Sequence, residues 1–373
     1  MLQRLRNVRA RVYRAPVDVP VVTSFGVMRD RPMVLVSVED DDGAIGWGEA
    51  WCNFPTVGAE HRARLVESVV APLVEGRAFE TPQEAFRLLT SKTAVLALQS
   101  GESGPIAQAI AAVDIAIWDL AARRAGEPLW RMLGGQSPRL RVYASGINPD
   151  SPERIALARR EEGYTAFKLK VGFGADRDLA NLRALRSALG DKAQLMADAN
   201  QGWSLDQAVD IAPRLEEFEL RWLEEPMRAD APWNDWQVLA RHTRIPLAAG
   251  ENIASDDAFD AALHAAALDV VQPDMAKWGG FSGCLPLAKR VLAAGLRYCP
   301  HYLGGGIGLL ASAHLLAARG DADGWLEVDA NENPLRTRLC PPLATLANGR
   351  IALAEAPGLG LEPDLAGLRA LCA

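Results

Sequence analysis

Seven short apolar segments in this chain each end in a side chain that can bind a metal ion or carry a proton. The segments and these residues are FKLKVG with Lys168 and Lys170, LMADAN with Asp198, WLEEP with Glu224, AAGEN with Glu251, VVQPD with Asp274, YCPH with His301 and WLEVD with Glu327. Counted from Lys170, the intervals are 28, 26, 27, 23, 27 and 26 residues. One strand plus one helix has about this length, and a barrel of alternating strands and helices brings the C-terminal ends of its strands to one mouth. The pattern therefore predicts one pocket that collects these residues.

Asp198, Glu224 and Glu251 stand at the ends of three successive predicted strands and offer only oxygen ligands. An oxygen-only set suits a hard cation such as magnesium. Any one of them could instead be a solvated or salt-bridged carboxylate at a barrel mouth, but three in register favour a metal site. Glu225 follows Glu224 directly, and because consecutive strand residues face opposite ways, only one of the two is expected to point at the pocket.

Lys168 and Lys170 lie two residues apart on an apolar strand, so both side chains face the same way. Lysine is almost never buried without a partner or a function. Two neighbouring ammonium groups are expected to lower each other's pKa, which makes a lysine a usable base near neutral pH. The alternative is an edge strand with a basic solvent face, but FKLKVG occupies the position of a central barrel strand.

His301 ends the seventh predicted strand and Asp274 the sixth, so these side chains are expected to be neighbours at the mouth. A carboxylate beside an imidazole fixes its tautomer and raises its basicity. Glu327 closes the series on the eighth strand. There it can donate a hydrogen bond to an oxygen of a bound anion if it is protonated.

A run of glycines, at Gly304, Gly305, Gly306 and Gly308, precedes a predicted helix. It has neither the GK[ST] ending nor the spacing of a nucleotide-binding loop, so a tight turn with close backbone approach is the better interpretation. The backbone N–H groups of such a turn can also bind a substrate anion at the start of the helix.

The elements that must hold these residues divide the chain into two units. Residues 8–51 read as strands of an antiparallel meander, with DDGA as a hairpin turn. Apolar residues at helical spacing predict helices near 59–76, 82–94 and 105–125. We expect residues 1–127 to form an N-terminal α+β capping domain, which the C-terminal segment 341–373 completes.

The larger unit, residues 128–340, is predicted to be a (β/α)7β modified TIM barrel of the α/β class. It begins with a strand at 140–147, followed by a helix whose N-cap is expected to be Ser151. Eight strands alternate with seven helices, and this alternation implies parallel pairing. The chain has 373 residues, which exceeds the size at which one core usually stops growing, and a barrel of roughly 200 to 250 residues fits the larger part.

The composition limits the classes of partner. About half of the residues are apolar (49%), 23% are charged and the formal net charge is −7. Nucleic acids and anionic membranes require a basic surface, so we expect neither as a partner and expect a small molecule instead. Five widely spaced cysteines without a CxxC pair indicate neither a disulfide framework nor a zinc site. No stretch approaches 18 uncharged apolar residues and no signal-peptide core follows the start, so a cytoplasmic protein is expected.

Taken in order, KxK, Asp, EEP, GEN, PD and a late His and Glu resemble the pattern of the enolase superfamily, mandelate racemase subgroup. The resemblance extends from the N-terminal meander through GGFSG to WLEVDANENPLR. It implies Mg2+ bound by Asp198, Glu224 and Glu251. It also implies abstraction of the proton next to a substrate carboxylate, a step that needs cations because it places a second negative charge on the same group.

The resemblance implies a role for the other side chains at the mouth as well. Lys170 is the base on one face of the substrate, and Lys168 beside it tunes its pKa and contacts the carboxylate. His301, paired with Asp274, is the acid or base on the opposite face. Glu327 donates a hydrogen bond to the enolate.

The substrate and the second half of the reaction depend on residues outside the repeat. The resemblance favours dehydration of an acid sugar, while racemisation or epimerisation and sugar-lactone cycloisomerisation use the same enolate and stay open. Asn200 in DANQGW resembles a further substrate contact, and the loops around Thr23 and Ser24 and around 51–56 are expected to cover the mouth. Lys277 either meets the distal carboxylate of a diacid, or it is solvated or supports residues that contact the substrate. Relatives often form even-numbered assemblies, so a homo-oligomer is expected.

Two other classes of protein compete with this interpretation. A barrel that has lost catalysis can serve as a binding protein, because fold does not fix function. Such a protein is expected to have lost at least one ligand or base, and none is missing here. A phosphate-handling barrel is the third hypothesis, and it predicts that phosphate stabilises the protein in thermal melts.

Overall fold

The computed structural model describes residues 3–23, 26–320 and 323–372. Its first unit opens with an antiparallel sheet in the order β1–β2–β3. The strands are β1 (Leu5–Thr23), β2 (Gly26–Asp40) and β3 (Ile45–Ala50). β1 and β2 are unusually long, and they pair from Leu5 opposite Asp40 to Thr23 opposite Gly26. The predicted meander is confirmed, with the DDGA turn between β2 and β3.

Helices cover one face of this sheet. They are α1 (Gly58–Leu65), a π-helical turn (Val66–Val70), α2 (Ala71–Val74), α3 (Pro82–Ser100), α4 (Ser103–Ala125) and the short α5 (Leu129–Met132). α4 is long and apolar enough to cross a membrane, but 83% of its most apolar window is buried inside the fold. α4 is therefore the core helix of the capping unit, packed on β3.

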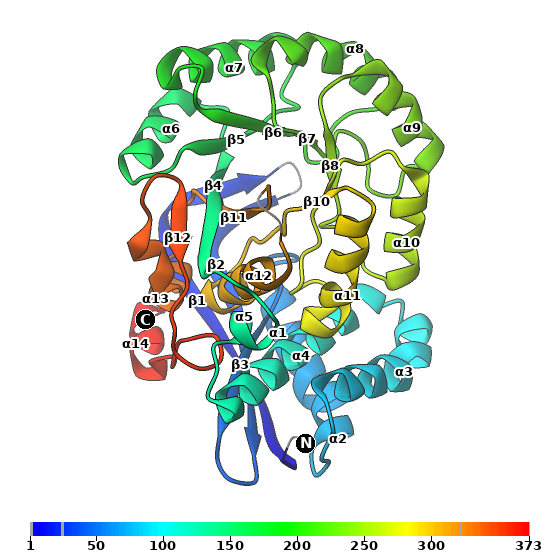
Figure 1. Cartoon of the computed structure of the whole chain (residues 1–373), viewed down its shortest axis with the longest axis vertical. Coiled ribbons are helices and arrows are strands. Elements are labelled where there is room, and N and C mark those ends of the chain that lie inside the picture. The colour runs from blue at the N-terminus through cyan, green and yellow to red at the C-terminus, as the bar shows by residue number, and fades with distance from the viewer. Residues whose placement is uncertain (1–2, 24–25, 321–322, 373) are drawn as a thin grey trace.

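The second unit is the predicted barrel of eight parallel strands. They are β4 (Arg139–Ile147), β5 (Ala166–Lys170), β6 (Gln194–Asp198), β7 (Leu223–Glu224), β8 (Leu247–Ala249), β9 (Val270–Val271), β10 (Arg297–Tyr298) and β11 (Trp325–Asp329). Their order in the sheet is β10–β9–β8–β7–β6–β5–β4–β11, so the sheet is nearly closed. In Figure 1 the strands β4 to β8 lie inside an arc of helices, with α3 and α4 of the capping unit below them in this view.

Seven helices connect these strands, as predicted. They are α6 (Pro152–Glu161), α7 (Ala175–Leu189), α8 (Leu205–Leu215), α9 (Trp233–His242), α10 (Asp256–Ala265), α11 (Gly280–Ala293) and α12 (Gly306–Arg319). Ser204 caps α8 in a reciprocal bond pattern with Gln207. Ser151 is the N-cap residue of α6, as predicted, but its backbone is left-handed (φ 53°) and its side chain makes no capping hydrogen bond.

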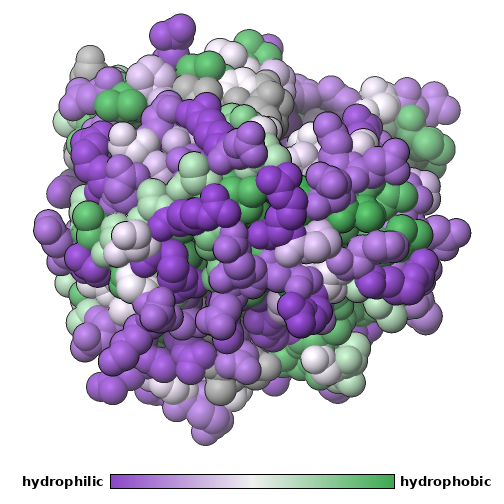
Figure 2. All heavy atoms as spheres, turned by 90° about the horizontal axis from the view of Figure 1, so that it is seen from above, coloured by the Kyte–Doolittle hydropathy of each residue, from purple (hydrophilic) through white to green (hydrophobic). Residues whose placement is uncertain are grey.

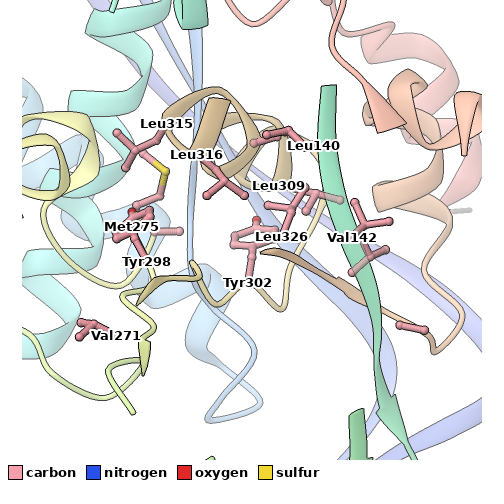
Figure 3. Packing of buried hydrophobic residues seen from close by; sticks show 14 of the residues in the cluster. Leu140, Val142, Val271, Met275, Tyr298, Tyr302, Leu309, Leu315, Leu316 and Leu326 are labelled. Atoms are coloured by element: carbon pink, nitrogen blue, oxygen red, sulfur yellow. The ribbon is translucent and has the colours of Figure 1, made fainter. Parts of the chain in front are cut away.

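The barrel has a packed interior and an apolar outer wall. One residue from or beside each strand fills the interior, namely Tyr143, Ala166, Met196, Trp222, Ala248, Val270, Cys299 and Trp325. On the outside, Figure 3 shows Leu309 and Leu316 of α12 among side chains of β4 and β11, such as Val142 and Leu326. The interior layer closes the barrel below the mouth, so substrates can reach only the C-terminal ends of the strands. Figure 2 shows a mostly hydrophilic surface with smaller apolar areas between.

The C-terminal segment contacts both units. It contains α13 (Pro334–Leu339), a 3-10 turn (Pro341–Thr345), β12 (Arg350–Ala352) and α14 (Leu365–Leu371). β12 pairs antiparallel with β4 of the barrel, whereas α14 packs near β1 of the capping unit. The division into 1–127 with 341–373 and 128–340 stays a prediction.

Buried carboxylates of the capping unit bind the N-termini of two barrel helices. Asp114 of α4 accepts hydrogen bonds from the backbone N (3.0 Å) and Oγ (2.5 Å) of Ser282 in the first turn of α11. Gly280 makes room for this carboxylate: its φ is 51°, and a Cβ there would lie 2.3 Å from Asp114 Oδ2. The GGFSG motif therefore serves contact between the two units.

Glu49 of β3 binds the start of α12 in the same way, at the glycine run that precedes this helix. Its carboxylate accepts hydrogen bonds from the backbone N of Gly305 (2.5 Å) and Gly308 (3.0 Å). The expectation that these N–H groups can bind a substrate anion is wrong, because the Glu49 carboxylate of the capping unit accepts their hydrogen bonds. A glycine run and an acid more than 250 residues away meet only in the folded chain.

Candidate active site

Parallel register places the strand-end residues side by side. Lys170 is in register with Asp198 on β5 and β6, and Asp198 is in register with Glu224 on β6 and β7. Glu251 follows β8, Asp274 follows β9 and His301 follows β10, all at the same end of the sheet. The structure thus gathers the residues singled out by their spacing at one mouth.

Lys168 is the centre of a buried ion-pair network. Its Nζ contacts a carboxylate oxygen of Glu224 and lies 2.9 Å from Glu327 and 3.7 Å from Asp198. The side chain is fully buried. Burial lowers the pKa of Lys168, but its ion pairs with Glu224 and Glu327 outweigh burial and hold the pKa well above its usual value.

Lys170 reaches further toward the opening, with 24% of its side chain exposed. Its Nζ lies 2.6 Å from Asp198 Oδ2. Burial lowers the pKa of Lys170, and the contact with Asp198 raises it above the usual value. Lys168 does lower the pKa of Lys170, as predicted, but Asp198 and Glu224 raise it more. The expected net lowering, toward a base near neutral pH, is therefore wrong for this arrangement.

The three carboxylates expected to hold a metal differ in charge state. Burial, with Asp198 and Glu327 close by, raises the pKa of Glu224 to about 7 although Lys168 contacts it. For Asp198 and Glu251, burial raises the pKa less than neighbouring cations lower it, and the net pKa is lowered. Glu224 is thus the member of the set that loses its proton least readily.

Donor chemistry, burial and strand position make Asp198, Glu224 and Glu251 fit a hard divalent cation. Asp198 and Glu251 are close enough to disfavour each other's charge. Lysine and imidazole cations contact these carboxylates in this structure, and no three metal-binding side chains of residues 3–23, 26–320 and 323–372 converge on one point. Lysine and imidazole cations now lie between these buried carboxylates. A divalent ion bound in their place would bring the carboxylate oxygens closer to one another.

His301 lies across the mouth from the lysines. Its Nδ1 is 2.9 Å from Asp274 Oδ2, as predicted, and its Nε2 is 2.5 Å from Glu251 and 3.8 Å from Glu327. Burial lowers the pKa of His301, but Glu251, Glu327 and the bond to Asp274 raise it well above its usual value. In this arrangement the imidazole is protonated and can donate a proton.

Lys168 and His301 favour the charged form of Glu327 in this arrangement, whereas the expected role as a hydrogen-bond donor needs its protonated form. Burial raises the pKa of Glu327, but Lys168 and His301 lower it further, and the net pKa is below its usual value. Ser145 Oγ and the backbone N of Tyr302 donate hydrogen bonds to its two oxygens. Ser145 escaped sequence reasoning because nothing in LRVYASGI distinguishes a structural serine from one that orients a carboxylate.

Glu225 and Asn252 were also missed. β7 ends at Glu224 and Glu225 has a left-handed backbone (φ 35°), so strand alternation does not decide the direction of the Glu225 side chain. Glu225 is buried and accepts hydrogen bonds from Asn252 Nδ2 at 3.0 and 2.9 Å. Burial and the charge of Glu251 raise the pKa of Glu225 well above its usual value. Burial and the neighbouring charge thus favour the protonated form of Glu225.

Lys277 connects the capping unit to the mouth. Its Nζ lies 3.5 Å from Glu251 Oε2, 3.2 Å from Asn252 Oδ1 and 4.8 Å from the ring centroid of Trp51. Trp51 follows β3, and its backbone N donates to Ala276 O (3.2 Å). Lys277 is largely buried, so the solvated alternative is wrong.

The structure describes the predicted contacts at Asn200 and in the 51–56 loop, but not those at Thr23 and Ser24. Asn200 lies beside Asp198, to which its backbone N (2.8 Å) and Nδ2 (3.2 Å) donate. Thr23 ends β1 at the turn of the long hairpin, and its side chain lies outside the described part of the chain, as does all of Ser24. In the 51–56 loop, Asn53 Nδ2 donates to Leu303 O (2.6 Å), which ties this loop to the strand end that carries His301.

The chain matches two protein-family models. Residues 152–367 match the model described as enolase C-terminal domain-like, and residues 6–134 match the mandelate racemase/muconate lactonizing enzyme N-terminal domain. The chain belongs to the mandelate racemase/muconate lactonizing enzyme family of the enolase superfamily. Members of this superfamily are magnesium-dependent, and a racemase structure from Streptomyces coelicolor with bound magnesium is similar at 28% identity and a TM-score of 0.87, covering 99% of this chain and all of that one.

Individual family members are similar over nearly the whole chain. D-galactarolactone cycloisomerase of Agrobacterium fabrum is 30% identical over 96% of each chain, and arabinonate dehydratase of Saccharolobus solfataricus is 27% identical over 89% of each. A solved mandelate racemase/muconate lactonizing enzyme from Bordetella bronchiseptica is 60% identical over both full lengths, with a TM-score of 0.95. The protein is therefore an enzyme of the lyase or isomerase class.

Proposed function

We propose that this enzyme removes the proton next to the carboxylate of a hydroxy acid and forms an enolate. The placement of Lys170 and His301 carries the proposal: four strands lie between β5 and β10 in the sheet, and the carboxylates stand between them. A substrate at the mouth then has a base on one face and an acid or base on the other. Asp198, Glu224 and Glu251 would hold Mg2+, which when bound supplies the positive charge that an enolate dianion needs.

The chain's own residues would divide the work around this substrate. Lys170 would take the α-proton on Nζ in its neutral form, which requires relief of the contact with Asp198 that raises its pKa. Lys168, fixed by its buried ion pairs, contacts the substrate carboxylate. Asn200 and Lys277 contact other oxygens of the substrate, and Lys277 suits a distal carboxylate because it is a buried cation near the opening. Glu327, held by Ser145, orients the substrate oxygens and His301 through its charge.

His301 would decide the overall reaction. If its proton goes to the departing β-hydroxyl, water leaves and an acid sugar is dehydrated to an enol that becomes a 2-keto acid. Arabinonate dehydratase is similar over most of the chain, which supports this outcome. Cycloisomerisation is the second candidate, because D-galactarolactone cycloisomerase covers 96% of the chain, and there a ring oxygen leaves in place of hydroxide.

The expected location, assembly and class of partner are part of the same proposal. We propose a cytoplasmic homo-oligomer acting on a small hydroxy-carboxylate rather than on nucleic acid or membrane. The burial of most of α4 and the acidic composition support a protein free of the membrane. Loops at the turn of the long β1–β2 hairpin and after β3 would select the substrate.

Proton exchange tests the proposal directly. The protein is incubated with a panel of acid sugars and sugar lactones in D2O with Mg2+ and followed by proton NMR. We expect loss of the α-proton signal with at least one substrate, with a 2-keto acid product for dehydration or an opened lactone for cycloisomerisation. Absence of both exchange and product for every hydroxy acid tested contradicts it.

A further inference from the structure

An arginine-lined cavity lies at the end of the barrel opposite the catalytic mouth. Its volume is about 280 Å³, and it opens to solvent between the turn before β4, the start of β4, the end of α12 and β12. Its charged lining residues are Arg139, Arg141 and Arg350. No aspartate or glutamate is among the described lining residues, although the chain as a whole has a net charge of −7.

Strand register forces two of these charges together. Arg350 of β12 stands directly opposite Arg141 of β4, and like charges at opposed positions of an antiparallel pair are destabilising. Arg139 lies two residues before Arg141, on the same face of β4. Asp323 reaches Arg141 at 3.4 Å, but it is 60% exposed, so solvent weakens this pair. Among the ion pairs of the described residues, none includes Arg139 or Arg350.

A helix end explains only part of this charge. Arg319 lies in the last turn of α12, where a cation interacts favourably with the helix carbonyls. One of its guanidinium nitrogens lies 3.8 Å from the position that a Cβ on Gly134 would take, so it adds a cation at the rim. Strands have only small dipoles, so this explanation does not extend to the arginines of β4 and β12. Arg139 and Arg350 are exposed to solvent, and Arg141 also lies over the ring of Trp325 (5.5 Å to the centroid). The concentration of these guanidinium groups around one open hollow suits an anion.

The cavity fits more than a single ion. One water takes about 30 Å³ in the liquid, so about 280 Å³ leaves room for an organic group beside an anionic one. Guanidinium groups bind phosphate through two parallel N–H donors. Leu140 and Leu316 form an apolar wall, and Figure 3 shows them between α12 and β4. We propose that this cavity binds the phosphate group of a small phosphorylated molecule.

Thermal melts test the site with two probes. Inorganic phosphate and a hexose phosphate are each compared with sodium chloride at equal ionic strength. A ligand that binds only the folded chain raises Tm with its concentration. We expect a rise of about 2–4 °C near saturation, with the hexose phosphate acting at lower concentration than inorganic phosphate. If the wild-type protein shows no rise specific to phosphate, the proposal is overturned.

Three variants locate the response. Arg350→Gln is expected to weaken phosphate binding by about tenfold or more, because a charged hydrogen-bond donor is lost. Arg9→Gln, which changes an exposed arginine of β1, is expected to respond like the wild type. Lys170→Ala is also expected to keep the response. If the response survives in Arg350→Gln but disappears in Lys170→Ala, phosphate binds at the catalytic mouth and the proposal is overturned. None of these results depends on turnover, so the enolate proposal is tested separately.

Discussion

At the scale of single residues, Lys168 controls the charge of the site. It is fully buried among Glu224, Glu327 and Asp198. All three carboxylates share this ammonium group, although Asp198 also contacts Lys170 and Glu327 also faces His301. A buried charge that loses its partner is costly. A divalent cation bound by the same carboxylates would therefore compensate their negative charge, as Lys168 does.

Lys168→Met is expected to destabilise the protein in a metal-dependent way. We expect a loss of about 3–5 kcal/mol in the free energy of unfolding in EDTA, since the carboxylates stay buried without their cation. The loss is expected to be smaller with millimolar Mg2+. Urea denaturation measures both, and Lys92→Met, at an exposed lysine of α3, is the control. An equal loss with and without Mg2+ would contradict a shared role.

Lys170→Ala and His301→Asn are expected to lower kcat by at least about 10²–10⁴-fold each without changing the circular dichroism spectrum. The two variants are expected to differ in exchange. His301→Asn keeps Lys170, so α-proton exchange in D2O continues for substrates whose proton faces Lys170, whereas Lys170→Ala loses it. Full activity in either variant refutes the role assigned to that residue.

Sequence patterns revealed which residues meet, but they did not reveal their charge states. The KxK pattern shows only that two ammonium groups are close enough to repel each other, because it covers three neighbouring residues. The pKa of Lys168 depends on carboxylates 56 and 159 positions away, at Glu224 and Glu327. The direction of the Glu225 side chain likewise depends on a feature that the local pattern does not show, namely where β7 ends.

At the scale of elements, α11 and α12 begin on carboxylates of the capping unit. The first turn of a helix carries N–H groups without partners inside the helix and a positive dipole end, which an acid satisfies. Asp114 and Glu49 supply these acids from α4 and β3. The strand–helix repeat was predictable because its periodicity is local, but these junctions join residues far apart in the chain, and neither GWGEAW nor the apolar pattern of α4 marks them.

Asp114 is expected to make stability depend on pH. Burial raises its pKa to about 7 in the folded chain, while an unfolded aspartate has a pKa of about 3.9. Between these values the folded state binds more protons, so stability falls as pH rises from about 4 to about 7, by about 1.4 kcal/mol per unit at most, and levels off above. Asp114→Asn removes this slope.

Urea denaturation between pH 5 and 8 measures the effect. We expect Asp114→Asn to gain stability relative to the wild type as pH rises through this range. Asp206→Asn, at an exposed aspartate in the first turn of α8, is expected to follow the wild type at every pH. If the free energy of unfolding changes with pH in the same way in all three proteins, Asp114 does not titrate as proposed.

At the scale of the whole molecule, the two units share too many buried polar contacts to fold apart. The barrel supplies N–H groups, and the capping unit supplies their acceptors. The ion pair between Arg31 of β2 and Asp329 of β11, at 2.8 Å and almost fully buried, is a further buried contact between the units. Here the capping unit supplies the donor and the barrel the acceptor. Separation would leave each of these groups without a partner, at about 1–3 kcal/mol per group.

The full chain is therefore expected to unfold in one transition. Tryptophan fluorescence and far-ultraviolet circular dichroism should give coincident denaturation curves. A fragment of residues 128–340 alone is expected to show no cooperative transition. If that fragment melts cooperatively, the barrel has an independent core and the argument from shared contacts fails.

The two acids that cap barrel helices restrict how this family can change by recombination. A chimera that takes its first unit from one relative and its barrel from another inherits Glu49 and Asp114 from one parent and their N–H partners from the other. Such an exchange succeeds only where both parents keep these pairs. New substrates are then more accessible through substitutions in the hairpin turn and the loop after β3 than through exchange of the whole unit.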